Sequence, residues 1–351
     1  MDILSLKLGI AFLYDKKKAV KQARSCSSAQ EFFGLYREKI EKIRNSDEFE
    51  KARSFIENND VSLISIWDKA YPEALLDLQD APIVLFVEGD VSRLNNSRRV
   101  GIVGSRRASA YGLNAAQSFA YELAQLNISV ISGLAIGIDT YAHKGALKAG
   151  GITAAVIGSG LADMYPKQNR ALSERIIGLG GVVISEYPPF VPPMRYNFPR
   201  RNRIISALSE VLLVMEAGKR SGALITAGFS LDLGRDVFSL PGQINAVNSM
   251  GSNKLIFDGA IPLLSVEDVL LSMGINRKTA VLKNQREREY IIDKYNGNPH
   301  PILKLLNKKC RLDVEEICLA LQKDASYVLK ELMKLELNGE IKRKGAFVYI
   351  R

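Results

Sequence analysis

Residues 100–112 (VGIVGSRRASAYG) combine a hydrophobic run, small residues and two arginines, a pattern that suits the binding of an anion. The pattern predicts a strand, a tight turn and a helix that begins near Ser109. Gly104 and Ser105 would let backbone N–H groups converge at the helix N-terminus, where phosphate groups bind readily. Arg106 would add a forked, permanently charged donor. A plain strand-to-helix turn with exposed arginines explains the same residues equally well.

Residues 185–209 (SEYPPFVPPMRYNFPRRNRIISALS) predict a second charged surface. Five prolines lie between Pro188 and Pro199, which predicts an extended, stiffened segment. No acidic residue lies between Tyr187 and Leu208. Cations can neutralise the phosphates of a single nucleic-acid strand while aromatic rings stack on its unpaired bases. The residues predicted to act in this way are Arg195, Phe198, Arg200 and Arg203.

A structural role for this segment is the alternative. In that case Phe198 belongs to the hydrophobic core, and the arginines pair with Glu186 and Glu210. The segment alone leaves both interpretations open.

Further glycine-rich turns join predicted strands to predicted helices within residues 132–147, 158–172 and 215–242. In a parallel sheet, all such turns reach the same edge. The second turn would place Lys167 and Asn169 there. In the third, Ser221 and Thr226 could donate to a phosphate or cap the following helix.

Asp139 and His143 are four residues apart, so they would share one face of a helix. The chain has only two histidines, and no third metal ligand lies nearby, which favours capping and packing over a metal site. The central region contains no G-x-S-x-G elbow, no P-loop lysine and no paired carboxylates. We therefore predict neither catalysis nor a cofactor.

The elements that carry these turns alternate between short apolar strands and helical segments from about residue 61 onward. This alternation predicts an α/β fold with a doubly wound parallel sheet that binds ligands at the carboxyl ends of its strands. The expected strands are 84–89, 99–104, 129–133, 154–158, 182–186, 210–216 and 236–242.

Two smaller regions flank the predicted central domain, residues 61–274. Residues 1–60 have a helical pattern, with a capped helix start at 27–32. Residues 275–288 are polar and basic, which predicts a linker. Residues 289–351 contain three short helical segments and a hairpin, the order of a winged-helix domain.

Charge and composition indicate the class of partner. Of the net charge of +10, residues 276–351 contribute +7, from 17 basic and 10 acidic residues. This excess indicates a polyanion, nucleic acid before a membrane, although an ordinary solvated surface is an equal alternative. No apolar run approaches the roughly 20 residues of a membrane-spanning helix. Cys26, Cys310 and Cys318 lack metal-ligand spacing, and the start of the chain lacks the features of a signal peptide, so we expect a cytoplasmic protein.

Taken together, the motifs resemble the DNA-processing protein A family (DprA, also called Smf). The matching segments occur in the family's order across residues 71–260: YPEALLDLQDAPIVLFVEG, IVGSRRASAYG, SGLAIGIDTYAHKGAL, the GSG…YPKQN turn, NFPRRNRIISALS, EAGKRSGALITAGFSLDLGRDVFSLPG and SMGSNKLIFDGA. The resemblance implies an extended Rossmann-like domain that dimerises, binds single-stranded DNA and loads the RecA recombinase during natural transformation. It also implies a sterile-alpha-motif-like domain before the central domain.

Matched by position, the resemblance implies a DNA pocket formed by Arg106, Lys167, Arg195 and Phe198. The family's winged helix varies, so its function here is open between duplex contact and protein contact. The residues that would contact a duplex are Lys330, Lys334, Lys342, Arg343 and Lys344.

Two other functions compete with this hypothesis. Nucleotide phosphoribohydrolases share the Rossmann variant but use a working glutamate, and here Ala227 and Gly228 occupy the comparable place. A winged-helix transcription regulator would need specific duplex binding by the C-terminal domain, which shows no clear base-reading residues beyond its basic cluster.

Overall fold

The structure is a computed structural model that describes residues 2–13, 16–277, 300–308, 312–338, 340–344 and 347–350. The chain divides into two compact units between Ile275 and Asn276. Each unit has a hydrophobic core of its own. Within the described ranges, no helix combines the length and the apolar character needed to cross a membrane.

The first unit is built on a nine-stranded sheet in the order β1-β2-β6-β5-β4-β3-β7-β8-β9, counted over the described residues. Its strands are β1 (Val61–Ser65), β2 (Val84–Gly89), β3 (Arg98–Val103), β4 (Ile128–Ser132), β5 (Thr153–Ile157), β6 (Val182–Ser185), β7 (Val211–Val214), β8 (Asp236–Ser239) and β9 (Ile261–Pro262). All seven predicted strands are present, as β2 to β8. Neighbouring strands from β6 to β9 run parallel, so the predicted doubly wound α/β class is confirmed.

One edge of the sheet differs from the all-parallel prediction. β1 pairs with β2 antiparallel, with Val61 opposite Glu88, and β2 pairs antiparallel with β6. β1 and β9 were not predicted from the sequence. Most of β1 is only partly buried, and β9 has two residues, the second of which is Pro262. Neither strand therefore carries the long apolar run that marks a buried strand.

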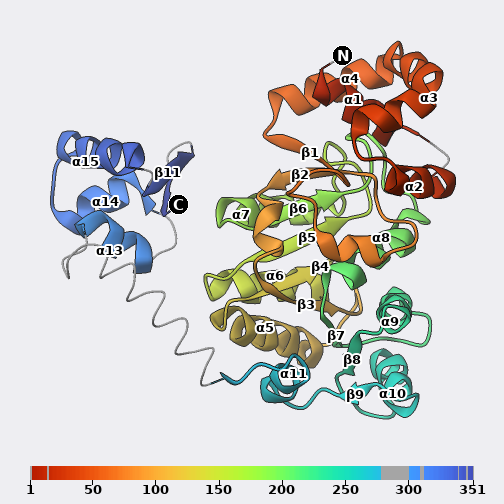
Figure 1. Ribbon diagram of the computed structural model, residues 1–351. Helices are drawn as coiled ribbons and strands as arrows, with labels where there is room; N and C mark the ends of the chain where they lie inside the picture. Colours follow the sequence, from red (N-terminus) through yellow and green to blue (C-terminus); the bar gives the residue numbers. More distant parts are fainter. Residues whose placement is uncertain are drawn as a thin grey trace. The chain divides into compact units, whose positions relative to one another are not determined.

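Helices cover both faces of this sheet (Figure 1). One face carries α5 (Ala110–Gln125), α6 (Ile138–Lys148) and α7 (Arg170–Gly178), and the other carries α8 (Asn197–Leu208) and α9 (Gly222–Asp232). Helices α10 (Met250–Phe257) and α11 (Val266–Ser272) lie at the β9 end. Every residue of β4, β5 and β7 is buried, because helices pack on both sides.

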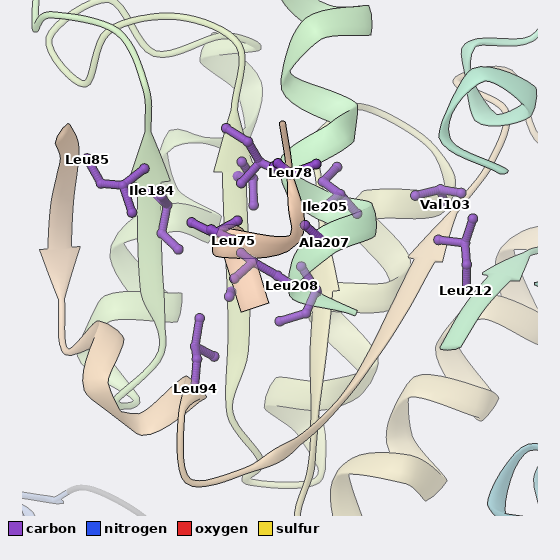
Figure 2. Packing of buried hydrophobic residues seen from close by; sticks show 14 of the residues in the cluster. Leu75, Leu78, Leu85, Leu94, Val103, Ile184, Ile205, Ala207, Leu208 and Leu212 are labelled. Carbon is purple, nitrogen blue, oxygen red and sulfur yellow. The ribbon is translucent and has the colours of Figure 1, made fainter. Parts of the chain in front are cut away.

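Helix α8 is anchored on the sheet by apolar packing (Figure 2). Its residues Ile205, Ala207 and Leu208 lie beside Leu75 and Leu78, which come from the segment before β2. All five are buried. Truncating one of these leucine or isoleucine side chains to alanine costs about 2–5 kcal/mol when the surrounding residues cannot fill the cavity. The packing therefore holds firmly the helix whose first turns carry Phe198 and the arginines.

The N-terminal part of the first unit is helical, with α1 (Ile3–Ala11), α2 (Lys16–Ser25), α3 (Ala29–Arg44) and α4 (Asp47–Asn58). The predicted cap of α3 is confirmed, since the Ser28 side chain accepts a hydrogen bond from the Glu31 N–H group. Phe32 and Phe49 of these helices share a core with Phe86 and Val183 of the sheet. The helices and the sheet therefore form one compact unit.

The second unit contains α13 (Pro301–Lys308), β10 (Leu312–Asp313), α14 (Val314–Leu321), α15 (Ala325–Leu337), β11 (Ile341–Lys344) and β12 (Phe347–Ile350). Its three strands have the order β10-β12-β11, and β11 and β12 pair antiparallel. This order of helices and a hairpin is the one the sequence indicated, and the winged-helix assignment stays a prediction. Most of the expected linker, residues 278–288, lies outside the described residues.

Candidate nucleic-acid interface

The two arginine-bearing segments singled out in the sequence meet at one place in the fold. The guanidinium carbon of Arg106, in the turn after β3, lies 4.9 Å from the centre of the Phe198 ring at the start of α8. The Tyr165 ring, which follows β5, lies 5.9 Å from the Phe198 ring at a tilt of 58°. Arg106 and Tyr165 are exposed and Phe198 is half-buried. A cation and two aromatic rings are thus presented together beyond the carboxyl ends of parallel strands.

Residues 185–209 are not the extended segment that the prolines predicted. A turn closes at Val191, whose N–H group donates to the carbonyl oxygen of Pro188 (3.0 Å). Helix α8 begins at Asn197, so Phe198 and the arginines after it lie on a helix. Pro199 occupies the first turn, where a proline removes no intrahelical hydrogen bond and its ring meets no preceding turn. The prediction failed because Pro199 was counted with the prolines that stiffen the chain upstream.

The glycine turn after β5 allows Phe198 to approach the sheet closely. A Cβ atom placed on Gly158 would lie 2.9 Å from Cδ1 of Phe198. A larger residue at this position would force the ring to move. The turn therefore sets the position of the ring that Arg106 contacts.

Arg203 was predicted to contact DNA, but its side chain is buried and paired within the protein. Its side chain is 3% exposed, its Nε donates to Asp80 Oδ2 (2.9 Å), and its Nη2 donates to Glu186 Oε1 (2.9 Å). A guanidinium that is buried and paired with two carboxylates is not available to a phosphate.

The structural alternative for the arginines is thus partly correct. Arg200 lies 3.7 Å from Glu186 but keeps 37% of its side chain exposed, so it remains a candidate contact. Glu210 instead pairs with Arg98, 2.5 Å away.

Arg201 is one of the arginines of the 185–209 segment, but it was not among the predicted DNA contacts, and it ties several parts of the site together. Its Nη1 donates to the carbonyl oxygens of Gly133 (2.7 Å) and Val156, at the ends of β4 and β5. Burial lowers the pKa of Arg201 to about 10. Asp139 accepts hydrogen bonds from the N–H groups of Gly133 (3.1 Å) and Ala135 (3.3 Å), and burial raises the pKa of this carboxyl. Arg201 of α8 therefore joins the ends of β4 and β5 from beneath.

His143 and Asp139 have the packing and capping roles that the sequence favoured. His143 Nδ1 lies 2.7 Å from Thr153 Oγ1, and complete burial lowers the pKa of the imidazole to about 3. The ring is therefore neutral at physiological pH. No group of three His, Cys, Asp or Glu side chains suited to a metal ion occurs among the described residues.

The anion site predicted at Ser105 is filled from within the protein. The Ser105 N–H group donates to the carbonyl oxygen of Glu216 (2.7 Å), which contradicts its predicted role. The Glu216 carboxylate accepts hydrogen bonds from the N–H and hydroxyl groups of Ser109, at the N-terminus of α5. A Cβ on Gly104 would lie 2.5 Å from Ile138 Cγ1, so this glycine serves close packing. The negative charge that the N-terminus of α5 attracts is thus supplied by a buried carboxylate of the protein itself.

Two further predicted cations, Lys167 and Arg195, are exposed. Lys167 follows Tyr165 by two residues, and Arg195 precedes Phe198 by three. Within the described part of the chain, neither side chain forms an ion pair, and neither does Arg106. Among the described residues, no ion pair or ring contact joins Lys167 or Arg195 to the other predicted residues. The structure brings Arg106 against Phe198, and it brings Arg200 and Arg203 together at Glu186.

Three polar residues near these turns have structural roles. The Asn169 side chain donates to the carbonyl oxygen of Leu134 and to Thr140 Oγ1, both at 2.8 Å. Ser221 caps α9, and the Thr226 hydroxyl donates to the carbonyl oxygen of Gly222, four residues earlier. The capping alternative is therefore the correct one for this helix.

The duplex candidates of the second unit are only partly described. Lys330 and Lys334 are exposed on α15, and Lys334 pairs with Glu331 (2.7 Å). Arg343 pairs with Glu336 (2.5 Å). Lys342 and Lys344 lie in β11, and their side chains fall outside the described residues. Duplex contact by this unit stays a prediction.

Comparison with known proteins shows which family the first unit resembles. Residues 62–274 match the profile of a family described as DNA recombination-mediator protein A. Protein Smf of Escherichia coli strain K12 is 42% identical over 250 residues, which cover 71% of this chain and 64% of that protein. DNA processing protein DprA of Streptococcus pneumoniae is 42% identical over 231 residues, which cover 66% of this chain and 78% of that protein. The match thus spans just under two thirds of the Escherichia coli relative.

Solved structures show the same relationship. The X-ray structure of DNA processing protein A from Streptococcus pneumoniae aligns with a TM-score of 0.63 and 34% identity, over 77% of this chain and 98% of that one. The structure of DNA processing protein A from Helicobacter pylori, described for its single-stranded DNA binding mode, aligns with a TM-score of 0.55 and 28% identity, over 61% of this chain and 95% of that one. With the profile match across more than half of its residues, the chain belongs to the DNA recombination-mediator protein A family.

Proposed function

We propose that this protein binds single-stranded DNA as a recombination mediator and has no catalytic activity of its own. The contact between Arg106 and Phe198 is the observation that carries the proposal. An exposed cation beside a ring suits a strand whose phosphate and unpaired base must be held together. A duplex keeps its bases stacked inside, so the ring would have no partner there.

The cations around the ring support the proposal. Lys167 and Arg195 are exposed on the two segments that flank Tyr165 and Phe198. Each phosphate that they neutralise would release counterions, so binding should weaken steeply as salt increases. The Helicobacter pylori relative, which is described as binding single-stranded DNA, supports the same assignment.

We further propose that the protein acts as a homodimer in the cytoplasm and delivers its strand to a RecA recombinase during natural transformation. Exposed apolar side chains near the β9 end of the sheet support the dimer: Phe257 on α10, Leu264, and Leu271 on α11. Three large apolar side chains exposed within 15 residues of one another in the sequence are of the kind that protein contacts cover.

Binding of fluorescent oligonucleotides to the full chain tests the proposal. We expect the protein to prefer a single strand over a duplex of the same length at low salt, and to lose affinity for both as salt increases. The Arg106→Ala and Phe198→Ala variants together should lose most of the single-strand preference. Equal affinity for strand and duplex in the unaltered protein would contradict the proposal, and release of free base from nucleoside monophosphates would revive the phosphoribohydrolase alternative.

A further inference from the structure

We propose that Lys51 and Phe190 form a second nucleotide-binding position, which extends the single-strand path from Arg106 and Phe198 onto the N-terminal helices. Lys51 lies on α4, and Phe190 lies in the proline-rich segment before α8. The Lys51 ammonium is 4.3 Å from the centre of the Phe190 ring, the same combination of cation and ring as Arg106 over Phe198 at 4.9 Å. This inference rests on the proposed function.

The turn after β5 places the two pairs close together. Gly158 abuts the Phe198 ring. Two residues later, the Gly160 N–H group donates to the carbonyl oxygen of Val191 (2.8 Å), next to Phe190. Since two residues of extended chain span at most about 7 Å, one short turn supports both aromatic positions. A single strand that passes Phe198 is therefore within reach of Phe190.

The segment between the two phenylalanines carries further exposed apolar, aromatic and basic side chains. Met194 and Tyr196, which lie between the two phenylalanines in the sequence, are 42% and 68% exposed. Arg195 stands exposed between them. Unpaired bases need apolar or aromatic faces along their path, and their phosphates need cations. The segment from Phe190 to Phe198 offers both.

The Lys51–Phe190 pair has features that a packing contact alone would not require. Phe55 of α4 holds the Phe190 ring by an edge contact, with centroids 5.5 Å apart and a 71° angle. This contact fixes the ring, yet 39% of Phe190 stays exposed. Lys51 forms no ion pair within the described residues, so its charge remains available. Asp47 and Glu48 lie one turn earlier on α4 and weaken the pull of Lys51 on a phosphate, so the ring should contribute more than the cation.

Oligonucleotides of two lengths test the inference in the full chain. We would measure the affinity for a dT oligomer of about 5 nucleotides, sufficient for the Arg106–Phe198 position, and for one of about 20 nucleotides. Phe190→Leu keeps an apolar side chain against Phe55 but removes the ring. It should weaken binding of the long oligomer about five- to tenfold, and Lys51→Ala about two- to threefold, with the short oligomer unchanged.

Two matched variants serve as controls. Phe190→Tyr keeps the ring and should bind both lengths as the unaltered protein does. Lys39→Ala removes a lysine that lies over the Tyr36 ring on α3, at 5.9 Å, and should also leave both affinities unchanged.

Three results would decide against the inference. Unchanged binding of the long oligomer by both Phe190→Leu and Lys51→Ala would overturn it. Equal losses for the two lengths in Phe190→Leu would also overturn it, because the change would then act through the Arg106–Phe198 position. If the unaltered protein bound neither oligomer, the proposed function itself would fail, and this inference with it.

Discussion

The guanidinium of Arg203 and the carboxylate of Glu186 lie 2.9 Å apart, and both side chains are almost completely buried, at 3% and 4% exposed. Asp80 adds a second carboxylate partner from a segment 123 residues away in the sequence. When two opposite charges are buried together, their attraction offsets the loss of hydration, whereas a single buried charge without its partner destabilises the fold. Arg203 therefore belongs to the buried framework beneath the proposed DNA-binding surface.

Arg203→Ala should accordingly reduce the stability of the fold. We expect the free energy of unfolding to fall by about 3–5 kcal/mol, because the Glu186 carboxylate is left buried without this partner. Urea denaturation checks the change. The control is Arg37→Ala, which removes an exposed partner of Glu41 and should cost no more than about 0.5 kcal/mol. An unaltered unfolding curve for Arg203→Ala, combined with lost DNA binding, would show that Arg203 contacts the strand after all.

Arg106 and Phe198 should act as a coupled pair. Phe198→Ala is expected to weaken single-strand binding by about 1–3 kcal/mol through lost stacking. Since the two side chains touch, the loss in the double variant should differ from the sum of the single losses by at least about 0.5 kcal/mol. A double-mutant cycle on oligonucleotide affinity measures this coupling free energy. Strictly additive losses would argue that the two residues contact separate parts of the strand.

Gly158→Ala should disturb the same ring without touching DNA. The new methyl group would lie 2.9 Å from the Phe198 ring and displace it from beneath Arg106, so we expect weaker oligonucleotide binding. Gly228→Ala is the matched control, because a Cβ atom there meets nothing within 4 Å and the position lies inside α9. That change should raise stability by up to about 1 kcal/mol and leave binding unchanged. Equal binding by both variants would contradict the placement of the ring.

His143 should make the stability of the first unit depend on pH. Burial lowers the pKa of the folded imidazole to about 3 from its usual 6.5, so only the unfolded chain takes up this proton between those values. Stability from this group is complete above pH 6.5 and falls as the pH drops toward 3, by up to about 1.4 kcal/mol per pH unit.

Urea denaturation at several pH values, compared between the protein and His143→Gln, isolates this effect of His143. The comparison is needed because burial raises the pKa of the Asp139 carboxyl, and that shift favours the folded state at low pH. Parallel pH profiles for the two proteins would show that His143 is accessible to protons in the folded state.

Sequence patterns predicted the central strands well, because a strand buried on both faces appears in the sequence as a continuous apolar run. β4, β5 and β7 are continuously buried, and each has a run of apolar or small residues to match. Strand direction leaves no such trace. The antiparallel placement of β1 and β2 depends on how residues 61–89 pack against β6, which no local pattern records.

Parts of the site were predictable for the same kind of reason. Arg106 and Phe198 stand in segments whose composition suits a nucleic acid, and the structure brings them into contact. Arg203 was misassigned because its partner Asp80 is distant in the sequence. The structural roles of Arg201 and Glu216 could not be predicted from the sequence, because only the fold shows that both side chains are buried. Tyr165 lies in the YPKQN turn and had no predicted role, and its exposed ring beside Phe198 gives it a place in the site.

The carboxylate of Glu216 at the start of α5 has a consequence for competition inside a cell. In dinucleotide-binding folds of this architecture, the first strand-to-helix turn holds the ligand's pyrophosphate. Here the buried carboxylate of Glu216 occupies that position, so the phosphates of ATP or NAD would be repelled by a negative charge where they would have to bind. We therefore expect free nucleotides to bind weakly at this turn. A ligand of the surface around Arg106 and Phe198 would then have to gain its affinity from several contacts made at once, as a polymer can.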